Sequence, residues 1–328
     1  MQRLSHDSLS HKAVILDGHA LNPGDLSWEP FRALVPDLTV HDRTPPALVL
    51  ERCEGADIVI VNKTVLDAAT INALPRLRYI GVLATGYNVV DIAAAHARGI
   101  VVTNVPAYST DSVAQTVFAF ILEHSMNVAK HSEAVHQNGW TNCPFFYFQV
   151  TPLHELAHKT IGIVGLGRIG RKVAEIAHAF GMEVVAHSRT EKTDVPDYIK
   201  QIDLDKLFKE SDFVTLHCPL TPQTEKLVNA EKLALMKRSA ILINTSRGPV
   251  VDEAALADAL NNGQIAGAAA DTLSTEPPKA DNPLLTAKNC FITPHLAWAT
   301  AEAKSRLVDV LVNNIKAFAE GAPINVVN

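Results

Sequence analysis

Short apolar runs alternate along this chain with segments whose apolar residues recur at helical spacing. Near the N-terminus the runs lie at 13–17, 57–61, 79–83 and 100–103, and a helical pattern spans 91–98. Strands that alternate with helices are typical of a parallel sheet covered by helices. The pattern therefore predicts an α/β domain in the first third of the chain.

The same alternation returns in the second half of the chain. Its short apolar runs lie at 161–164, 183–187, 213–216, 240–244, 266–270 and 290–293. These runs predict six strands, which is the number in a complete doubly wound dinucleotide-binding sheet. We therefore expect two α/β domains, each with a doubly wound parallel sheet.

Two long helical patterns bear on how the domains connect. The apolar segment 109–128 begins with Ser109, Thr110 and Asp111, which are good helix-capping residues, and its length predicts a helix that links two domains. The last pattern, 299–320, is expected to return to the first domain. We therefore predict a discontinuous first domain, residues 1–104 plus 295–328, and a second domain of residues 105–294.

Composition narrows the class of protein. The 328 residues are 47% hydrophobic and 20% charged with a net charge of −6, which is typical of a globular protein, and no Lys/Arg-rich run indicates a nucleic-acid or membrane partner. No apolar run approaches the roughly 20 residues that span a bilayer. The opening MQRLSHDSLSHK has no apolar core of a secretory signal and predicts a loose extension. The four cysteines form no C-x-x-C pair, so we expect reduced thiols and a cytoplasmic location.

A glycine-rich turn follows the predicted strand at 161–164. Gly165, Gly167 and Gly170 are spaced G-x-G-x-x-G between a strand and a helix, within one βαβ unit. In dinucleotide-binding folds these glycines permit a tight turn, a close approach of a pyrophosphate and close helix packing. The pattern predicts a dinucleotide site; the alternative is that the glycines only shape a tight turn.

The end of the next strand indicates which nicotinamide cofactor is preferred. An acidic residue there would bind the ribose 2′-hydroxyl of NAD, but the chain has Ser188, Arg189 and Thr190 instead. A cation and two hydroxyls suit the 2′-phosphate of NADP. We therefore favour NADP(H), with NAD(H) as the alternative in which Arg189 is an ordinary surface residue.

Polar residues follow three later strands. Arg247, then Asp271 with Glu276, then His295 each come after a predicted strand end. Taken singly, each has a simpler explanation: Arg247 could pair with Asp252, and His295 is one of 14 histidines. The carboxyl ends of strands line the ligand crevice of a doubly wound sheet, so together these residues predict a catalytic site.

Four ordered motifs carry a family resemblance. They are G-L-G-R-I-G, N-T-S-R-G-P-V-V-D, A-A-A-D-T-L-S-T-E-P and T-P-H-L-A-W-A-T. In this order the chain, from about residue 13 to its end, resembles the D-isomer-specific 2-hydroxyacid dehydrogenases. The resemblance implies two Rossmann-like domains, of which the discontinuous substrate domain is flavodoxin-like. The W-T-N-C-P-F-F-Y-F insert and the H-L-A-W-A-T form are most similar to the glycerate dehydrogenase/hydroxypyruvate reductase branch.

The resemblance implies roles for individual residues. Arg247 would bind the substrate carboxylate and carbonyl, His295 would be the general acid/base, and Glu276 would pair with His295. The implied cofactor contacts are Thr110, Gly165, Gly167, Arg168, Ile169, Gly170, Ser188, Arg189, Thr190, Cys218, Pro219, Thr224, Thr245 and Asp271. The implied substrate contacts are Ala84, Thr85, Gly86, Arg247, His295 and Trp298.

The implied activity is hydride transfer between a nicotinamide cofactor and a small D-2-hydroxy acid or 2-oxo acid. The branch favours D-glycerate with hydroxypyruvate, and glyoxylate. A D-lactate-type or phosphoglycerate dehydrogenase is the nearest alternative. A corepressor-like protein that senses NAD(H) shares the fold and the Arg-Glu-His set, and is the alternative of another class.

Two further segments bear on partners and metals. The aromatic stretch 138–153 is too apolar for a free linker, so we expect it to pack over a neighbouring surface, with a homodimer as a plausible outcome. The segment 154–158 fits H-E-x-x-H, the zinc-protease pattern. Because it lies between Pro152 and the strand that begins near residue 160, there is room for little more than one helical turn, and we expect no metal site.

Overall fold

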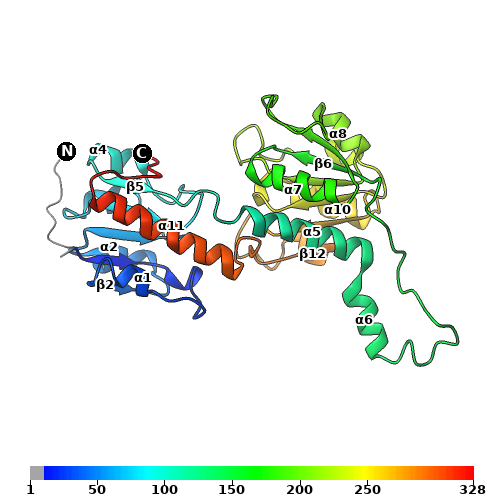
Figure 1. Cartoon of the computed structure of the whole chain (residues 1–328), viewed down its shortest axis with the longest axis horizontal. Coiled ribbons are helices and arrows are strands. Elements are labelled where there is room, and N and C mark those ends of the chain that lie inside the picture. Colours follow the sequence, from blue (N-terminus) through cyan, green and yellow to red (C-terminus); the bar gives the residue numbers. More distant parts are fainter. Residues whose placement is uncertain (1–10) are drawn as a thin grey trace. The chain divides into compact units, whose positions relative to one another are not determined.

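The computed structural model of the chain describes residues 11–328, and the predicted N-terminal extension up to residue 10 lies outside them. The chain divides into two compact units (Figure 1). The first unit runs to Ser109 and resumes over Ala299–Asn328, and the second comprises Thr110–Trp298. Within residues 11–328, no helix is both long and apolar enough to span a membrane.

The first unit is built on a five-stranded parallel sheet. Its strands are β1 (Ala13–Ile15), β2 (Leu38–Val40), β3 (Ile58–Val61), β4 (Tyr79–Val82) and β5 (Val101–Thr103). The strand order β2-β1-β3-β4-β5 is the flavodoxin order, as the resemblance implied. Strands β1, β3 and β4 are continuous apolar runs because both faces of the sheet are covered by helices.

The helices of the first unit are α1 (Glu29–Arg32), α2 (Val49–Cys53), α3 (Ala68–Asn72), α4 (Ile92–Ala97) and α11 (Ala301–Ala319). Side chains cap the starts of α3, α4 and α11, whereas α1 and α2 begin without a side-chain cap. The Asp91 carboxylate accepts a hydrogen bond from the Ala94 N–H at 2.9 Å and so starts α4. The C-terminal helix α11 belongs to this unit, where buried Leu311 packs closely against Gly81 of β4 (Figure 1).

The second unit contains a seven-stranded parallel sheet. Its strands are β6 (Thr160–Val164), β7 (Glu183–His187), β8 (Ile199–Gln201), β9 (Phe213–Leu216), β10 (Ile241–Asn244), β11 (Gly267–Ala270) and β12 (Cys290–Ile292). The order is β12-β11-β10-β9-β6-β7-β8, which is doubly wound about β6. The expectation of six strands was wrong, because the edge strand β8 is a seventh that no apolar run marks.

The helices of the second unit are α5 (Thr110–Met126), α6 (Val128–His136), α7 (Arg168–Ala179), α8 (Leu204–Glu210), α9 (Ala230–Leu235) and α10 (Glu253–Asn261). Helices α5, α7, α8, α9 and α10 cover the two faces of the sheet, whereas α6 buries none of its residues. Residues of α5 and α7 form one buried cluster with Ile161 and Ile243, while α8, α9 and α10 form another with Val214 and Leu242. Neighbouring residues of one strand thus face opposite layers of helices.

The aromatic segment after α6 does not pack as expected. Figure 1 shows α6 and the chain that follows it projecting from the body of the second unit. Phe145, Phe146 and Tyr147 are 72%, 86% and 61% exposed. The stretch therefore does not pack on the rest of this chain, and its packing on a partner chain stays a prediction.

Candidate functional site

The glycine-rich turn connects β6 to α7 in the second unit. Gly165 has a φ of +105°, which favours glycine, and its N–H donates to the His187 carbonyl at 2.8 Å. A side chain at Gly170 would lie 2.1 Å from the Gly165 carbonyl oxygen. The third glycine therefore lets α7 begin directly against the turn.

The same turn leaves room for an anion at the start of α7. A Cβ added at Gly167, the N-cap of this 12-residue helix, would meet no atom within 4 Å. The Thr245 hydroxyl at the end of β10 is buried without a hydrogen-bond partner among the described residues. Open space at a helix N-terminus and an unpartnered buried hydroxyl both fit a bound dinucleotide.

Of the three residues after β7, Ser188 forms a hydrogen bond within the protein, and Arg189 and Thr190 are exposed to solvent. Ser188 Oγ accepts a hydrogen bond from the Leu166 N–H at 3.1 Å, which ties this strand end to the glycine-rich turn. Arg189 and Thr190 are exposed, and neither forms a hydrogen bond or ion pair with the residues that the structure describes. The Arg189 guanidinium is thus available to a ligand at the end of β7.

The loop after β9 carries three further expected contacts. The Cys218 thiol is partly buried, and burial raises its pKa, so the thiol stays protonated at neutral pH. The Thr224 hydroxyl donates to the Pro219 carbonyl at 2.6 Å and accepts from the Thr221 N–H at 2.8 Å. The hydroxyl of Thr224 therefore shapes its own loop.

Arg247 lies in the loop that follows β10. Its guanidinium is exposed and donates to the Ser246 carbonyl at 2.8 Å. The Asn244 side chain accepts hydrogen bonds from the N–H and the hydroxyl of Ser246 and donates to the Arg247 carbonyl at 2.9 Å. Asn244 thus shapes the Arg247 loop, a role that the sequence analysis missed although asparagine is a common turn former.

His295 and Glu276 form a direct contact. The distance from His295 Nδ1 to Glu276 Oε2 is 2.7 Å, and the side chains are 28% and 33% exposed. The Leu273 N–H also donates to Glu276 Oε1 at 3.2 Å and so orients the carboxylate. With Nδ1 engaged by Glu276, Nε2 is the ring nitrogen that can exchange a proton with a ligand.

Asp271 organises the loop that carries His295. Its carboxylate is buried and accepts from the Thr293 hydroxyl at 2.6 Å, the Leu296 N–H at 2.8 Å and the Ala297 N–H at 3.0 Å. Its carbonyl accepts from the His295 N–H at 2.9 Å, and His295 itself has a left-handed φ of 52°. Asp271 therefore imposes the backbone path from which the His295 side chain projects.

In the first unit, the loop after β4 carries Ala84, Thr85 and Gly86. The Asn104 amide donates to the Thr85 carbonyl at 2.7 Å, and the Val105 N–H donates to the Ala84 carbonyl at 3.0 Å. The N–H groups of Thr85 and Gly86 donate to none of the described residues. These two N–H groups can therefore bind a ligand.

A buried carboxylate that the sequence analysis missed lies beside this loop. Asp17, after β1, accepts hydrogen bonds from the N–H groups of Asn62, Lys63 and Thr64 at 2.5–2.8 Å. The Asn62 amide in turn donates to the Leu83 carbonyl at 3.2 Å. The A-V-I-L-D run ending in Asp17 was a possible signal, since a carboxylate at a strand end binds backbone N–H groups.

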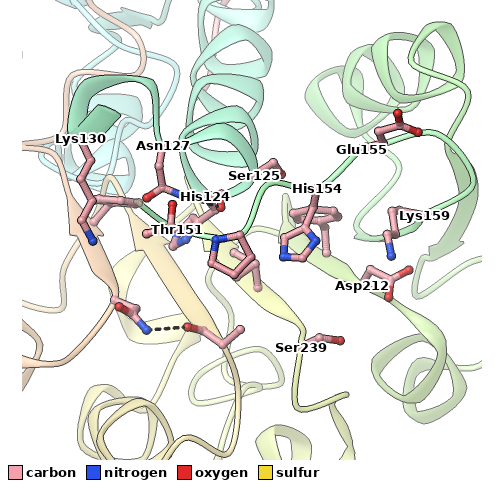
Figure 2. Close-up of a pocket in the computed structure, with 16 residues that line it drawn as sticks. His124, Ser125, Asn127, Lys130, Thr151, His154, Glu155, Lys159, Asp212 and Ser239 are labelled. Carbon is pink, nitrogen blue, oxygen red and sulfur yellow. Dashed lines mark hydrogen bonds between the residues drawn. The ribbon is translucent and has the colours of Figure 1, made fainter. Parts of the chain in front are cut away.

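A pocket of about 390 Å³ lies at the opposite edge of the second sheet, at the amino ends of β9 to β12 (Figure 2). His154 and Glu155 of the H-E-x-x-H segment line it, but the segment 154–158 is not helical, and the Glu155 carboxylate points away from the His154 ring. Among residues 11–328, no group of three or more His, Cys, Asp or Glu side chains could bind a metal ion. Ligands of doubly wound sheets bind at the carboxyl edge, so this pocket is not the catalytic site.

The expected residues of the second unit gather at that carboxyl edge. Arg247, Asp271 and His295 follow β10, β11 and β12, which are neighbours in the sheet, and the glycine-rich turn follows β6 at the same edge. Thr110 begins α5, and Trp298 is the last residue of the unit. Ala84, Thr85 and Gly86 belong to the first unit.

Comparisons with known proteins agree on one family. Residues 118–297 match the family described as D-isomer specific 2-hydroxyacid dehydrogenase, NAD binding domain. The chain is 46% identical over 321 residues to a hydroxypyruvate reductase of Blautia hydrogenotrophica, covering 97% of this chain and 99% of the relative. It is 42% identical over 284 residues to a glycerate dehydrogenase of Methylorubrum extorquens, covering 86% and 88%. Among solved structures, an NADPH-dependent glyoxylate/hydroxypyruvate reductase of Sinorhizobium meliloti, in complex with NADP and malonate, has a TM-score of 0.83 at 32% identity, with 97% of each chain covered.

Proposed function

The chain belongs to the D-isomer specific 2-hydroxyacid dehydrogenases, and we propose that it reduces hydroxypyruvate to D-glycerate, with glyoxylate as a second substrate. The contact that carries this proposal is the 2.7 Å pair of His295 and Glu276. Glu276 follows β11 and His295 follows β12, and β11 lies between β12 and the strand β10 that precedes Arg247. An acid, its partner and a fixed cation are the groups that reduction of a 2-oxo acid requires.

Each residue of this set has a separate task. Arg247 is permanently charged and forked, so it can bind the carboxylate and polarise the 2-oxo group. His295 Nε2 donates a proton to the oxygen that becomes the hydroxyl. Glu276 pairs with Nδ1 of the ring at 2.7 Å and so orients the imidazole. A bound nicotinamide supplies the hydride.

The two units divide the ligands between them. The second unit, which includes the matched NAD-binding residues, would bind the cofactor through the glycine-rich turn, Thr245 and the loop of Cys218. The first unit would bind the substrate carboxylate through the N–H groups of Thr85 and Gly86. Trp298 would select among side chains at C3 of the substrate.

NADPH is the favoured hydride donor. The three residues after β7 include no acid that would repel a 2′-phosphate, and Arg189 has no protein partner among the described residues. The Sinorhizobium meliloti relative is described as NADPH-dependent. A guanidinium at this strand end would bind the 2′-phosphate through charge-assisted hydrogen bonds.

Initial rates with hydroxypyruvate, glyoxylate and pyruvate, each with NADPH and with NADH, test these assignments. We expect the highest kcat/KM with hydroxypyruvate and NADPH. Arg189→Ala should raise the KM for NADPH by about tenfold while leaving that for NADH unchanged, since one charge-assisted contact is worth roughly that factor. A pyruvate preference would favour a D-lactate-type enzyme, and equal use of both cofactors would contradict the role of Arg189.

We also propose that the projecting aromatic segment joins two copies of the chain. Phe145, Phe146 and Tyr147 are more than half exposed, as is Trp140. Clustered aromatic side chains of this kind are enriched at protein interfaces. Light scattering at micromolar concentration should report a dimer. Phe146→Asp should shift it toward monomer, whereas Leu285→Asp, at an exposed apolar residue elsewhere on the second unit, should not. A monomeric wild-type chain would contradict the proposal.

A further inference from the structure

The segment between β7 and β8 carries the residues proposed to recognise the cofactor phosphate. It runs over 188–198 without regular structure. A loop of this kind is usually mobile unless its backbone has partners elsewhere. Here two side chains from neighbouring elements bind its main chain.

Gln201, in the edge strand β8, makes the first attachment. Its Oε1 accepts from the Lys192 N–H at 2.9 Å, and its Nε2 donates to the Lys192 carbonyl at 2.6 Å. Both backbone groups of Lys192 are thereby paired by one planar amide, as a neighbouring strand would pair them. Lys192 is three residues beyond Arg189 in the chain, so the attachment limits where Arg189 can lie.

Arg171, in the first turns of α7, makes the second attachment. Its guanidinium donates to the Asp194 carbonyl at 2.6 Å and to Asp194 Oδ1 at 2.7 Å. Beyond it, the Tyr198 ring stacks on His178 of α7 with centroids 4.1 Å apart. The pairing also lowers the pKa of Asp194 through its hydrogen bond with Arg171, so the carboxylate stays charged and neutralised by a partner.

These attachments bear on the free energy of binding. Fixing a mobile loop on a ligand opposes association, and a loop that is already ordered avoids that loss. The Arg171 pairing also removes an unpartnered acid from the segment that would approach a phosphate dianion. Both effects act on the segment that carries Arg189, the residue proposed to bind the 2′-phosphate.

From these contacts, and resting on the proposed NADPH preference, we propose that Gln201 is a positioning residue for recognition of the 2′-phosphate, with Arg171 as its second support. Neither residue need touch the cofactor. Gln201 acts by ordering the segment that carries Arg189, and Arg171 acts by ordering and neutralising it. Cofactor selectivity would then depend on residues from β8 and α7 as well as on the end of β7.

Calorimetric titration of the full chain with 2′,5′-ADP and with 5′-AMP tests this inference without turnover. The ratio of the two dissociation constants isolates the contribution of the 2′-phosphate. We expect Gln201→Leu to weaken 2′,5′-ADP by about 3- to 10-fold, the effect of ordering one or two side chains, and to leave 5′-AMP unchanged. Arg171→Met should act in the same direction.

Lys200→Ala is the matched control. Lys200 precedes Gln201 in β8, but its ammonium group pairs with Glu183 at 3.3 Å and makes no contact with the segment. This variant should keep the wild-type ratio of dissociation constants. Thermal unfolding of each variant separates a local effect from loss of the fold.

The outcomes distinguish this inference from the proposed function. If the wild-type chain binds 2′,5′-ADP no more tightly than 5′-AMP, the proposed NADPH preference is wrong. The positioning role of Gln201, which rests on that preference, is then wrong as well. If the wild-type chain prefers 2′,5′-ADP and Gln201→Leu retains that preference in full, the preference stands and the positioning role is wrong. Equal weakening of both ligands would also overturn it, because the effect would then not be specific to the phosphate.

Discussion

His295 and Glu276 form the contact on which the proposed proton transfer depends. Because Glu276 engages Nδ1, the ring is held in one orientation with Nε2 directed away from the carboxylate.

Replacing His295 tests that role. His295→Ala should lower kcat for reduction by on the order of 10² to 10⁴, the usual contribution of general acid catalysis. Glu276→Gln keeps an acceptor for the Nδ1 proton, so its loss should be smaller. Binding of 2′,5′-ADP should be unchanged in both variants, and a kcat for His295→Ala within a few-fold of wild type would rule out His295 as the acid.

The sequence sufficed to predict that Arg247, Glu276 and His295 follow strands whose carboxyl ends lie at one edge of a sheet, because the order of strands in this topology is known. It did not show how they are oriented. Asp271 was expected only to contact the cofactor, yet its carboxylate accepts three hydrogen bonds from the loop of His295. Such a role depends on the path of a loop with a left-handed residue, which no local pattern of residue types predicts.

Asp271→Asn should therefore impair both fold and turnover. An amide nitrogen in place of one carboxylate oxygen would face a backbone N–H, so we expect a loss of about 1–3 kcal/mol in the free energy of unfolding. A displaced His295 should lower kcat by about 10- to 100-fold. The control is Asp281→Asn, at an exposed aspartate whose side chain forms no hydrogen bond or ion pair with the described residues. Wild-type stability and kcat in Asp271→Asn would refute the positioning role.

From two buried histidines we predict how the free energy of unfolding depends on pH. Burial lowers the pKa of His124 to about 4 and that of His217 to about 3. In the unfolded chain both protonate near pH 6.5, so below that pH the unfolded state binds more protons and the folded state loses stability. Each should contribute on the order of 1 kcal/mol per pH unit between about pH 6 and 4. Urea unfolding at pH 7.5 and at pH 5.5 measures the change in the free energy of unfolding. His124→Gln should make that change smaller. Identical free energies of unfolding of the wild-type chain at the two pH values would contradict the prediction.

Secondary-structure elements differ in how well the sequence predicted them. The buried central strands are runs of apolar residues that stand out, as in β6 and β10. The missed strands, β2 and β8, are three-residue edge strands in which only the first residue is buried. An edge strand pairs on one side only and so requires little apolar sequence. Such a strand forms because its backbone pairs with the neighbouring strand.

The glycine-rich turn has two roles, nucleotide binding and close packing of α7. Substitutions at Gly167 and Gly170 test these two roles separately. Gly170→Val should destabilise the fold, because a side chain there would meet the Gly165 carbonyl. Gly167→Val places its side chain in open space, so the free energy of unfolding should change by less than about 1 kcal/mol while binding of 5′-AMP weakens about tenfold. Unchanged nucleotide binding in Gly167→Val would argue against an anion site at this helix.

At the scale of the whole molecule, the chain combines two doubly wound sheets with different strand orders. The flavodoxin order of the first unit offers free N–H groups after β4, and the dinucleotide-type order of the second offers the glycine-rich turn and the Arg-Glu-His set. The alternation of strands and helices predicted two parallel-sheet α/β domains, and the family resemblance implied the flavodoxin order of the first. Interfaces with other copies leave no such periodic signal in a sequence.

The most direct measurement is the product of hydroxypyruvate reduction by the purified chain with NADPH, analysed by chiral chromatography while oxidation of the cofactor is followed by absorbance. We predict rapid oxidation and D-glycerate as the product, with turnover lost in His295→Ala. L-glycerate would contradict the proposed specificity for D-2-hydroxy acids. If the chain binds 2′,5′-ADP but oxidises neither NADPH nor NADH with any 2-oxo acid, it would be a nucleotide-sensing protein that has this fold and no dehydrogenase activity.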